Sequence, residues 1–392
     1  MTASATIEAV EVLRTPPRWT FVRVQDSDGL IGWGEAIVPK RAGAVEGAIR
    51  DLAANLPGAP ANRIEELWSR MYRNASFRGG PVLATAAAAI DHALWDLKGR
   101  RYGLPAFEFF GGEVRDHIRA YAWIGGDRPT DVVTGAQERV RQGFSAVKMN
   151  ATAELDYLDS AEKVDGVIDR VASLRNEFGD SLDIVLDFHG RVHRAMAKRL
   201  IQALDEFRLL WIEEPLAPGY EDLLREVVST SAATPICTGE RLTNRWEFRR
   251  LFEAGVVDVV NPDVSITGLS ELVKICRMAE AYDIAVAPHS AQGPISLAAS
   301  LQAGACAANV VVTEYSGGMH YNLGYEGLAA ADVGDYLVDP SALQPVEGML
   351  SNPRQPGLGI ELDEPRLRAA AAEPWRLHEP MWRTEDGRIA EW

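Results

Sequence analysis

Three carboxylates recur at an even spacing in the middle of this 392-residue chain, each at the end of a short apolar run. They are Asp187, Glu213 and Glu240, spaced by 26 and 27 residues (187 to 213 and 213 to 240). A strand, a helix and two connecting loops take up about that length of chain. In a parallel barrel the ends of successive strands point into one mouth, so we expect these three side chains to converge there.

Converging carboxylates repel one another unless a cation lies between them. A site built only from oxygen ligands suits a hard divalent cation, and Mg²⁺ is the ion we expect, with one ion in each subunit. Asp187, Glu213 and Glu240 are therefore predicted metal ligands, and the chain is predicted to be a metal-dependent barrel enzyme.

A histidine and an aspartate end the next apolar runs and suggest proton transfer. Asp263 and His289 are 26 residues apart (263 to 289), so neighbouring strands would place them side by side. A carboxylate bonded to one imidazole nitrogen fixes the tautomer and raises the basicity of the other nitrogen. We predict that His289 is a general base and that Asp263 orients it.

Two further residues are expected to face the same mouth. His189 follows Asp187 by two residues, and alternate residues of a strand share a face, so His189 is available as a second proton-transfer group. Glu314 ends the eighth candidate strand. Among so many carboxylates we expect it to be protonated and to donate a hydrogen bond to a developing oxyanion.

The remaining histidines and cysteines are weaker candidates. We expect His92, His117 and His193 to be structural or solvated, whereas His320 follows the eighth strand and could lie either inside or outside the mouth. Cys237 has no basic neighbour in the sequence that would favour a nucleophilic thiolate. The sequence contains no P-loop, GxSxG or dinucleotide-binding motif.

The elements that position these residues form an alternating pattern from about residue 117. Eight candidate strands, the number that closes a (β/α)₈ barrel, alternate with helical stretches such as 154–178, 195–207, 245–254 and 269–282. The strands are expected to end near Trp123, Asn150, Asp187, Glu213, Glu240, Asp263, His289 and Glu314.

A separate α+β unit precedes the barrel. Two apolar runs flank Asp28-Gly29, a typical hairpin turn, and helical patterning follows at 43–55, 62–72 and 82–100. We predict an α+β capping domain over 1–115, a (β/α)₈ TIM-like barrel over 116–325, and a C-terminal extension over 326–392 that packs back on the capping domain.

Composition limits the partners and the compartment. The formal net charge of −16 argues against nucleic acid and anionic membranes as partners. Three cysteines without a CxxC spacing suit a reducing cytoplasm, and the N-terminus lacks the pattern of a signal peptide. The longest weakly polar stretch, 294–312, is interpreted as a buried helix plus a strand and not as a membrane span. We expect a cytoplasmic enzyme that acts on a small molecule.

The motifs around these residues resemble the enolase superfamily, whose members combine a Lys or His base with Mg²⁺. Within it the chain is similar, over nearly its whole length, to the sugar-acid dehydratases that act on galactonate. The matching segments are Pro16-Pro17-Arg18-Trp19, Phe77-Arg78-Gly79-Gly80-Pro81, Ala93-Leu94-Trp95-Asp96-Leu97-Lys98-Gly99, Gly125-Gly126-Asp127-Arg128-Pro129, Asp187-Phe188-His189-Gly190-Arg191-Val192, Glu213-Glu214-Pro215, Gly239-Glu240-Arg241, Ala287-Pro288-His289 and Ala390-Glu391-Trp392.

This resemblance implies a complete set of roles for dehydration of D-galactonate to 2-dehydro-3-deoxy-D-galactonate. His289, assisted by Asp263, would accept the α-proton, His189 would donate a proton to the leaving hydroxyl, and Glu314 would stabilise the transition state. The resemblance also implies a homo-oligomer. Candidates for binding the sugar acid are Lys148, Asn150, Arg18, Trp19 and Trp123.

Three alternatives stay open at this point. The substrate could be another aldonate, such as gluconate or mannonate, because loops over the mouth select the diastereomer. A racemase, epimerase or cycloisomerase of the superfamily typically has a Lys-x-Lys pair, and here the segment is Lys148-Met149-Asn150, which lacks the second lysine. A non-catalytic protein could reuse the barrel, because fold alone does not determine function.

Overall fold

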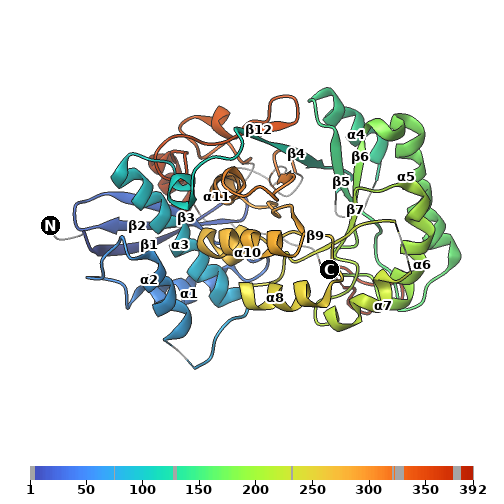
Figure 1. Ribbon diagram of the computed structural model, residues 1–392, viewed down its shortest axis with the longest axis horizontal. Helices are drawn as coiled ribbons and strands as arrows, with labels where there is room; N and C mark the ends of the chain where they lie inside the picture. Colours follow the sequence, from blue (N-terminus) through green and yellow to red (C-terminus); the bar gives the residue numbers. More distant parts are fainter. Residues whose placement is uncertain are drawn as a thin grey trace.

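The computed structural model describes residues 5–74, 76–126, 130–230, 233–319, 322, 331–373 and 381–391. Five residues named above lie outside this part of the chain: Asp127, Arg128, Pro129, His320 and Trp392. A small antiparallel sheet with its helices lies at one end of the molecule and a ring of parallel strands and helices at the other (Figure 1).

The small sheet is antiparallel in the order β1-β2-β3, as the hairpin pattern predicted. Helix α3, rich in alanine, packs directly on β3. The fit depends on glycine, because a Cβ on Gly34 would lie 1.8 Å from the carbonyl oxygen of Ala89. The elements of this unit are β1 (Ile7–Thr15), β2 (Trp19–Asp26), β3 (Ile31–Glu35), α1 (Ala42–Ala53), α2 (Ile64–Arg73), α3 (Pro81–Tyr102) and the short 3₁₀ helix η1 (Ala106–Phe110).

The large sheet contains eight parallel strands and confirms the predicted barrel. From β4 to β10 each strand pairs with the next, β11 pairs with β4, and a bridge between Val286 and Val310 links β10 to the segment before β11. Several strands are only two or three residues long. The strands are β4 (His117–Trp123), β5 (Ala146–Asn150), β6 (Asp183–Asp187), β7 (Trp211–Glu213), β8 (Ile236–Thr238), β9 (Val259–Val260), β10 (Ala285–Val286) and β11 (Thr313–Tyr315).

Helices surround this barrel on its outer side (Figure 1). One boundary corrects a prediction: the stretch 154–178 is helical only from Ala161, because Ser160 caps the helix and the preceding residues form a loop. The helices are α4 (Val132–Arg141), α5 (Ala161–Phe178), α6 (Arg194–Leu204), α7 (Leu224–Val228), α8 (Arg245–Ala254), α9 (Val264–Thr267), α10 (Leu269–Ala281) and α11 (Pro294–Ala305), with 3₁₀ helices η2 (Gly179–Ser181), η3 (Asp205–Phe207) and η4 (Glu221–Leu223).

The C-terminal part of the chain returns to the small sheet. After η6 (Pro340–Leu343), β12 (Met349–Ser351) pairs antiparallel with β4, and α12 (Glu364–Ala372) lies against β1. Arg368 on α12 donates to both carboxylate oxygens of Glu11 on β1 at 2.8 Å. The capping unit is therefore built from both ends of the chain. Within the described residues, no helix is long and apolar enough to span a membrane.

Buried carboxylates of the capping unit join it to the barrel. Glu35 accepts hydrogen bonds from the backbone N–H groups of Gly293 (2.6 Å) and Ile295 (3.0 Å) at the start of α11. Asp91 on α3 accepts from the backbone N–H of Ser270 at the start of α10 (2.9 Å). A carboxylate at a helix N-terminus satisfies free N–H groups and complements the helix dipole, so these contacts fix the two units together.

Candidate active site

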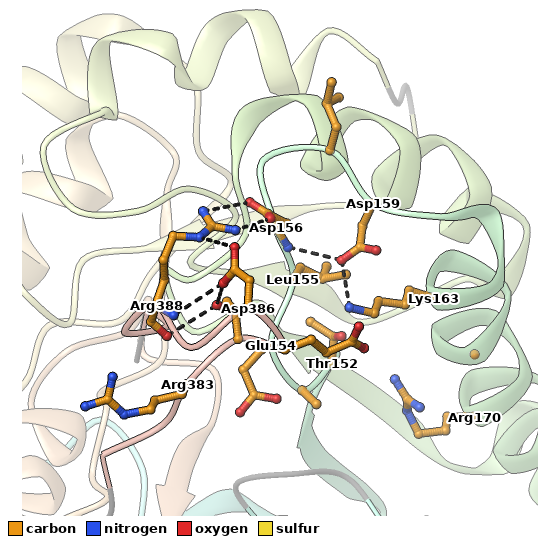
Figure 2. Close-up of a pocket in the computed structure, with 15 residues that line it drawn as sticks. Thr152, Glu154, Leu155, Asp156, Asp159, Lys163, Arg170, Arg383, Asp386 and Arg388 are labelled. Atoms are coloured by element: carbon orange, nitrogen blue, oxygen red, sulfur yellow. Dashed lines mark hydrogen bonds and ion pairs between the residues drawn. The ribbon is translucent and has the colours of Figure 1, made fainter.

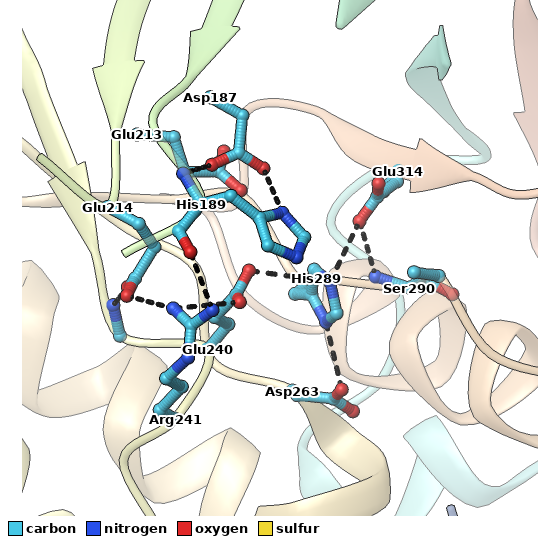
Figure 3. A network of polar contacts seen from close by, with 12 residues as sticks. Asp187, His189, Glu213, Glu214, Glu240, Arg241, Asp263, His289, Ser290 and Glu314 are labelled. Carbon is cyan, nitrogen blue, oxygen red and sulfur yellow. Dashed lines mark hydrogen bonds and ion pairs between the residues drawn. The ribbon is translucent and has the colours of Figure 1, made fainter. Parts of the chain in front are cut away.

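The three evenly spaced carboxylates converge at one end of the barrel, as their spacing predicted (Figure 3). Asp187 and Glu213 are the last residues of β6 and β7 and lie in register, while Glu240 follows the end of β8 by two residues. One oxygen atom from each side chain lies within 4.8 Å of the other two, and all three side chains are buried. This geometry places three negative charges in one small volume.

The cluster fits a hard divalent cation. Its ligand atoms are all carboxylate oxygens, the donor type that such cations prefer. One oxygen of the cluster, Glu240 Oε2, is buried and receives no hydrogen bond from the described part of the chain. Buried polar atoms are normally satisfied, so a buried carboxylate oxygen without a donor is suited to coordinate a metal ion.

A buried lysine already lies against this cluster. Lys148 Nζ is 3.2 Å from Asp187 Oδ2, contacts Glu213 Oε1 and lies 3.5 Å from Glu314 Oε1. Burial lowers the pKa of Lys148, but the charges of Glu213, Glu314 and Asp187 outweigh it and raise the pKa well above the usual value. The ammonium group is thus held in its charged form at the centre of the site.

The carboxylates of the cluster differ in their affinity for protons. Burial and the surrounding carboxylates raise the pKa of Glu213 to about 8 although Lys148 opposes this. Burial also raises the pKa values of Asp187 and Glu240, but their cationic neighbours outweigh it, so both pKa values are lowered. The neighbour of Asp187 is Lys148, and those of Glu240 are Arg241 and then His289. Glu213 therefore holds a proton more tightly than Asp187 or Glu240 does.

Asp263 and His289 meet as predicted, although both lie on loops beyond their strands. Asp263 Oδ2 is 2.8 Å from His289 Nδ1, and Asp263 Oδ1 accepts from the backbone N–H of Ser265 at 2.7 Å. His289 Nε2 faces the carboxylates, 3.5 Å from Glu240 and 3.6 Å from Glu314. Burial lowers the pKa of His289, but Glu240, Glu314 and the bond to Asp263 raise it to about 10.

His189 reaches the same cluster from the opposite side (Figure 3). Its Nδ1 lies 3.4 Å from Asp187 Oδ2, and its backbone N–H donates to Asp187 Oδ1 at 2.6 Å. The strand alternation used in the prediction is not the cause, because β6 ends at Asp187 and His189 adopts a left-handed turn with φ of 55°. The turn nevertheless brings both side chains to the mouth.

Glu314 lies within β11 and not at its end. Its side chain is fully buried, and its Oε2 accepts a hydrogen bond from the backbone N–H of Ser290 at 3.0 Å. The side chain faces both His289 and Lys148. The geometry therefore brings Glu314 into the site, and its role as a hydrogen-bond donor stays a prediction.

Two residues next to the predicted ligands were missed. Arg241 lies 3.1 Å from Glu240 Oε1, contacts Glu214, and donates to the carbonyl oxygen of His189 at 3.1 Å. Glu214 in turn accepts from the backbone N–H of Gly239 at 3.0 Å. Their position directly after Glu213 and Glu240 was the available signal. Together they tie the ends of β6, β7 and β8 into one unit.

The predicted substrate residues divide into two groups. Trp123 lies with its ring 5.2 Å from Lys148 Nζ, and the side-chain amide of Asn150 donates to the carbonyl of Gly126 at 3.4 Å, so both belong to the mouth. Arg18 donates to the carbonyl of Ala291, two residues after His289, at 2.5 Å. Trp19 is fully buried and packs edge-on against Tyr336 with ring centroids 5.6 Å apart, which corrects the predicted substrate contact.

The other histidines keep their structural interpretation. His92 is fully buried in α3, and burial lowers its pKa to about 4. His117 is exposed at the start of β4, and His193 stacks on Tyr157 with ring centroids 3.7 Å apart. Cys237 is buried, which raises its thiol pKa well above the usual value and opposes a nucleophilic role.

A second cavity of about 490 Å³ lies between the loop that follows β5 and the C-terminal segment, and it contains none of the predicted catalytic or metal residues (Figure 2). Arg388 pairs there with Asp156 at 2.5 Å, and Lys163 pairs with Asp159 at 2.9 Å. The pair between Arg388 and Asp156 holds the C-terminal segment against the loop that leads away from Asn150.

Comparisons with known proteins agree with this site. The model of the enolase C-terminal domain-like family matches residues 131–366, and that of the mandelate racemase/muconate lactonizing enzyme N-terminal domain matches residues 9–111. Curated relatives include the D-galactonate dehydratase of Ralstonia nicotianae, 44% identical over 98% of this chain and 100% of the relative, and that of Pectobacterium atrosepticum, 42% identical over the same shares.

Solved structures with a similar fold include two that are named as dehydratases. A proposed galactarate dehydratase from Agrobacterium radiobacter, with bound sodium and L-malate, has a TM-score of 0.86 and 29% identity and covers 98% of this chain and 99% of its own. A proposed dehydratase from Zymomonas mobilis ZM4 has a TM-score of 0.86 and 27% identity over 94% and 98%. From the two matched domains, the full-length relatives and the carboxylate cluster, the chain belongs to the mandelate racemase/muconate lactonizing enzyme group of the enolase superfamily.

Proposed function

We propose that this protein is a Mg²⁺-dependent hydro-lyase that converts D-galactonate to 2-dehydro-3-deoxy-D-galactonate and water. The observation that carries the proposal is that two histidines reach one carboxylate cluster, His289 beside Glu240 and bonded to Asp263, and His189 beside Asp187. Removal of an α-proton needs a base, and loss of a hydroxyl needs an acid as well. The D-galactonate dehydratases among the relatives support this substrate.

In the proposed reaction the C2–H bond of the sugar acid breaks and its proton passes to His289 Nε2. Asp263 holds the imidazole with Nε2 toward the mouth, since Asp263 Oδ2 engages Nδ1 at 2.8 Å. The electron pair of the C2–H bond is first taken up by the carboxylate of the substrate, which gives an enediolate, and it then forms the C2–C3 double bond as the C3–O bond breaks. His189 delivers a proton to the leaving oxygen, which departs as water, and the enol product ketonises.

Asp187, Glu213 and Glu240 are the residues that would hold Mg²⁺. When bound there, the ion would supply positive charge that stabilises the carboxylate of the substrate as the α-proton leaves. Glu314 and Lys148 would face the carboxylate oxygens of the substrate, because both side chains lie at the carboxylate cluster. Asn150, Trp123 and Arg18 are proposed to contact the remainder of the sugar acid.

The domain boundaries at 115 and 325, the homo-oligomer and the cytoplasmic location belong to the same proposal. The family-model matches over 9–111 and 131–366 support a boundary between capping unit and barrel near residue 115. The three free cysteines support a cytoplasmic location.

The test is turnover of a panel of aldonic acids with Mg²⁺, scored as 2-keto-3-deoxy product. We expect turnover of D-galactonate that is lost with EDTA and with His289→Asn. His117→Asn is the matched control, because His117 is exposed and lies at the opposite end of its strand from the mouth. Turnover of gluconate or mannonate instead would overturn the substrate, and racemisation without loss of water would overturn the reaction.

A further inference from the structure

The turn between β10 and α11 makes direct contacts with the residues around the proposed base. It begins at His289 and ends at Gly293, where α11 starts. The backbone N–H of Ser290 donates to Glu314 Oε2 at 3.0 Å. The carbonyl of Gln292 accepts from the hydroxyl of Ser316 at 3.0 Å. The turn thus connects His289 to the segment of β11 that carries Glu314.

The side chain of Gln292 bonds to the partner of the base. Its Nε2 donates to Asp263 Oδ2 at 3.1 Å, and the same oxygen is 2.8 Å from His289 Nδ1. The other oxygen, Asp263 Oδ1, accepts from the backbone N–H of Ser265. Three donors therefore fix both oxygens of Asp263, and Gln292 is the only side chain apart from His289 that donates to it within the described residues.

This contact is retained at an energetic cost. Gln292 is 5% exposed, and its Oε1 is buried without a hydrogen-bond partner in the described part of the chain. Burying an unsatisfied amide oxygen disfavours the folded state. An apolar side chain of the same length would avoid this cost, so packing alone does not account for a glutamine here.

The position of Gln292 is fixed from the capping unit as well as from the barrel. Glu35 accepts from the N–H groups of Gly293 and Ile295 and from the Ser296 hydroxyl at 3.0 Å. Arg18 donates to the carbonyl of Ala291. The turn is therefore held on both sides of Gln292, so that its amide is aimed at Asp263 with little freedom to move away.

We propose that Gln292 is a positioning residue that holds Asp263 in the orientation required to align His289 with the α-carbon of the substrate. The inference rests on the proposed function of His289. It assigns to Gln292 a role that acts through Asp263 and not by contact with the sugar acid.

The experiment compares Gln292→Met with Gln302→Met. Gln302 is a matched control because it is also a buried glutamine of this region, on α11, but its amide bonds to the carbonyls of Pro353 and Leu358, away from the mouth. Each purified, Mg²⁺-loaded variant is assayed for kcat, KM and the kinetic isotope effect with D-galactonate deuterated at C2. The thermal midpoint of unfolding is measured in parallel.

For Gln292→Met we expect kcat to fall about tenfold, because the variant loses one hydrogen bond to a charged group. We expect KM to be unchanged and the isotope effect to be larger than in wild type. Gln302→Met should lower the thermal midpoint and leave kcat and the isotope effect at their wild-type values. Wild-type kcat and isotope effect in Gln292→Met would overturn the inference, as would equal changes in both variants.

A second measurement does not depend on the substrate. The proton between His289 Nδ1 and Asp263 should give a downfield ¹H resonance that shifts in Gln292→Met and not in Gln302→Met. If wild type fails to turn over D-galactonate, the proposed function fails, and this resonance still decides the role of Gln292. An unshifted resonance in Gln292→Met would then reject it.

Discussion

Lys148 and Asp187 form a buried ion pair, with Nζ 3.2 Å from Oδ2 and each side chain 1% exposed. The barrel thus contains its own cation within the carboxylate cluster. This cation offsets part of the repulsion among Asp187, Glu213 and Glu240, so the chain can fold before a metal ion binds.

Replacing Lys148 tests this relationship. Lys148→Met should lower the free energy of unfolding of the metal-free protein by about 3–5 kcal/mol, because it leaves buried carboxylates without a counterion. Mg²⁺ should raise the thermal midpoint more in the variant than in wild type, since the ion replaces the lost charge. Thermal unfolding with and without Mg²⁺ measures both. Lys198→Met, which breaks an exposed pair with Glu226, is the control and should change little.

The two histidines should separate the two halves of the reaction. His189→Asn should retain exchange of the substrate α-proton with D₂O solvent and lose dehydration by a factor of about 10²–10⁴, because the acid is absent while the base remains. His289→Asn should lose both exchange and dehydration. Proton NMR of substrate and product in D₂O reports the two rates. Dehydration that survives in His189→Asn would remove this residue from the mechanism.

Metal affinity should rise with pH. In the metal-free protein the pKa of Glu213 is raised to about 8 and that of His289 to about 10, so both groups are protonated at pH 7. A cation among the carboxylates disfavours both protons, so its binding releases protons, and raising the pH from 6 to 9 removes the competition from the proton on Glu213. Calorimetry in buffers of different ionisation enthalpy should detect proton release. Mg²⁺ affinity that is constant over this range would contradict the prediction.

Asp91, at the junction of the capping unit and the barrel, makes a pH-dependent contribution to the free energy of unfolding. Burial raises its pKa in the folded protein to about 6, from 3.8 in the unfolded chain. Its contribution to stability is therefore complete below pH 3.8 and is lost as the pH rises through 6, a change of about 3 kcal/mol. Asp91→Asn should gain stability relative to wild type between pH 4 and 7 in urea unfolding. The exposed Asp116→Asn should show no such trend.

The barrel could be predicted from the sequence because polar residues follow short apolar runs at a regular spacing, and each such run marks one strand. Asp187 and Glu213 proved to be strand ends, but β8, β9 and β10 are so short that Glu240, Asp263 and His289 lie on the loops beyond them. The register of such loops depends on backbone contacts between strands distant in sequence. The spacing in the sequence therefore predicted that these side chains converge, but it could not predict the backbone conformation of each residue.

The errors have physical causes that act over long distances. Trp19 was assigned to the substrate because it follows Arg18, yet Tyr336 from the other end of the chain covers it. The helix expected from 154 begins at 161, since the preceding loop is held by the C-terminal segment through Arg388 and Asp156. Neither contact has a local signal. For Arg241, its position after Glu240 was a local signal, but its contact with the carbonyl of His189 depends on the folded barrel.

The packing of α12 against β1 also limits the order in which the protein can fold. Arg368 and Glu364 on α12 bind Glu11 and Arg23 on the first two strands. During synthesis these strands leave the ribosome long before α12 does. The face of the β1–β2 hairpin that α12 covers must therefore remain exposed until α12 has been translated, and it is open to chaperones that bind nascent chains during that time.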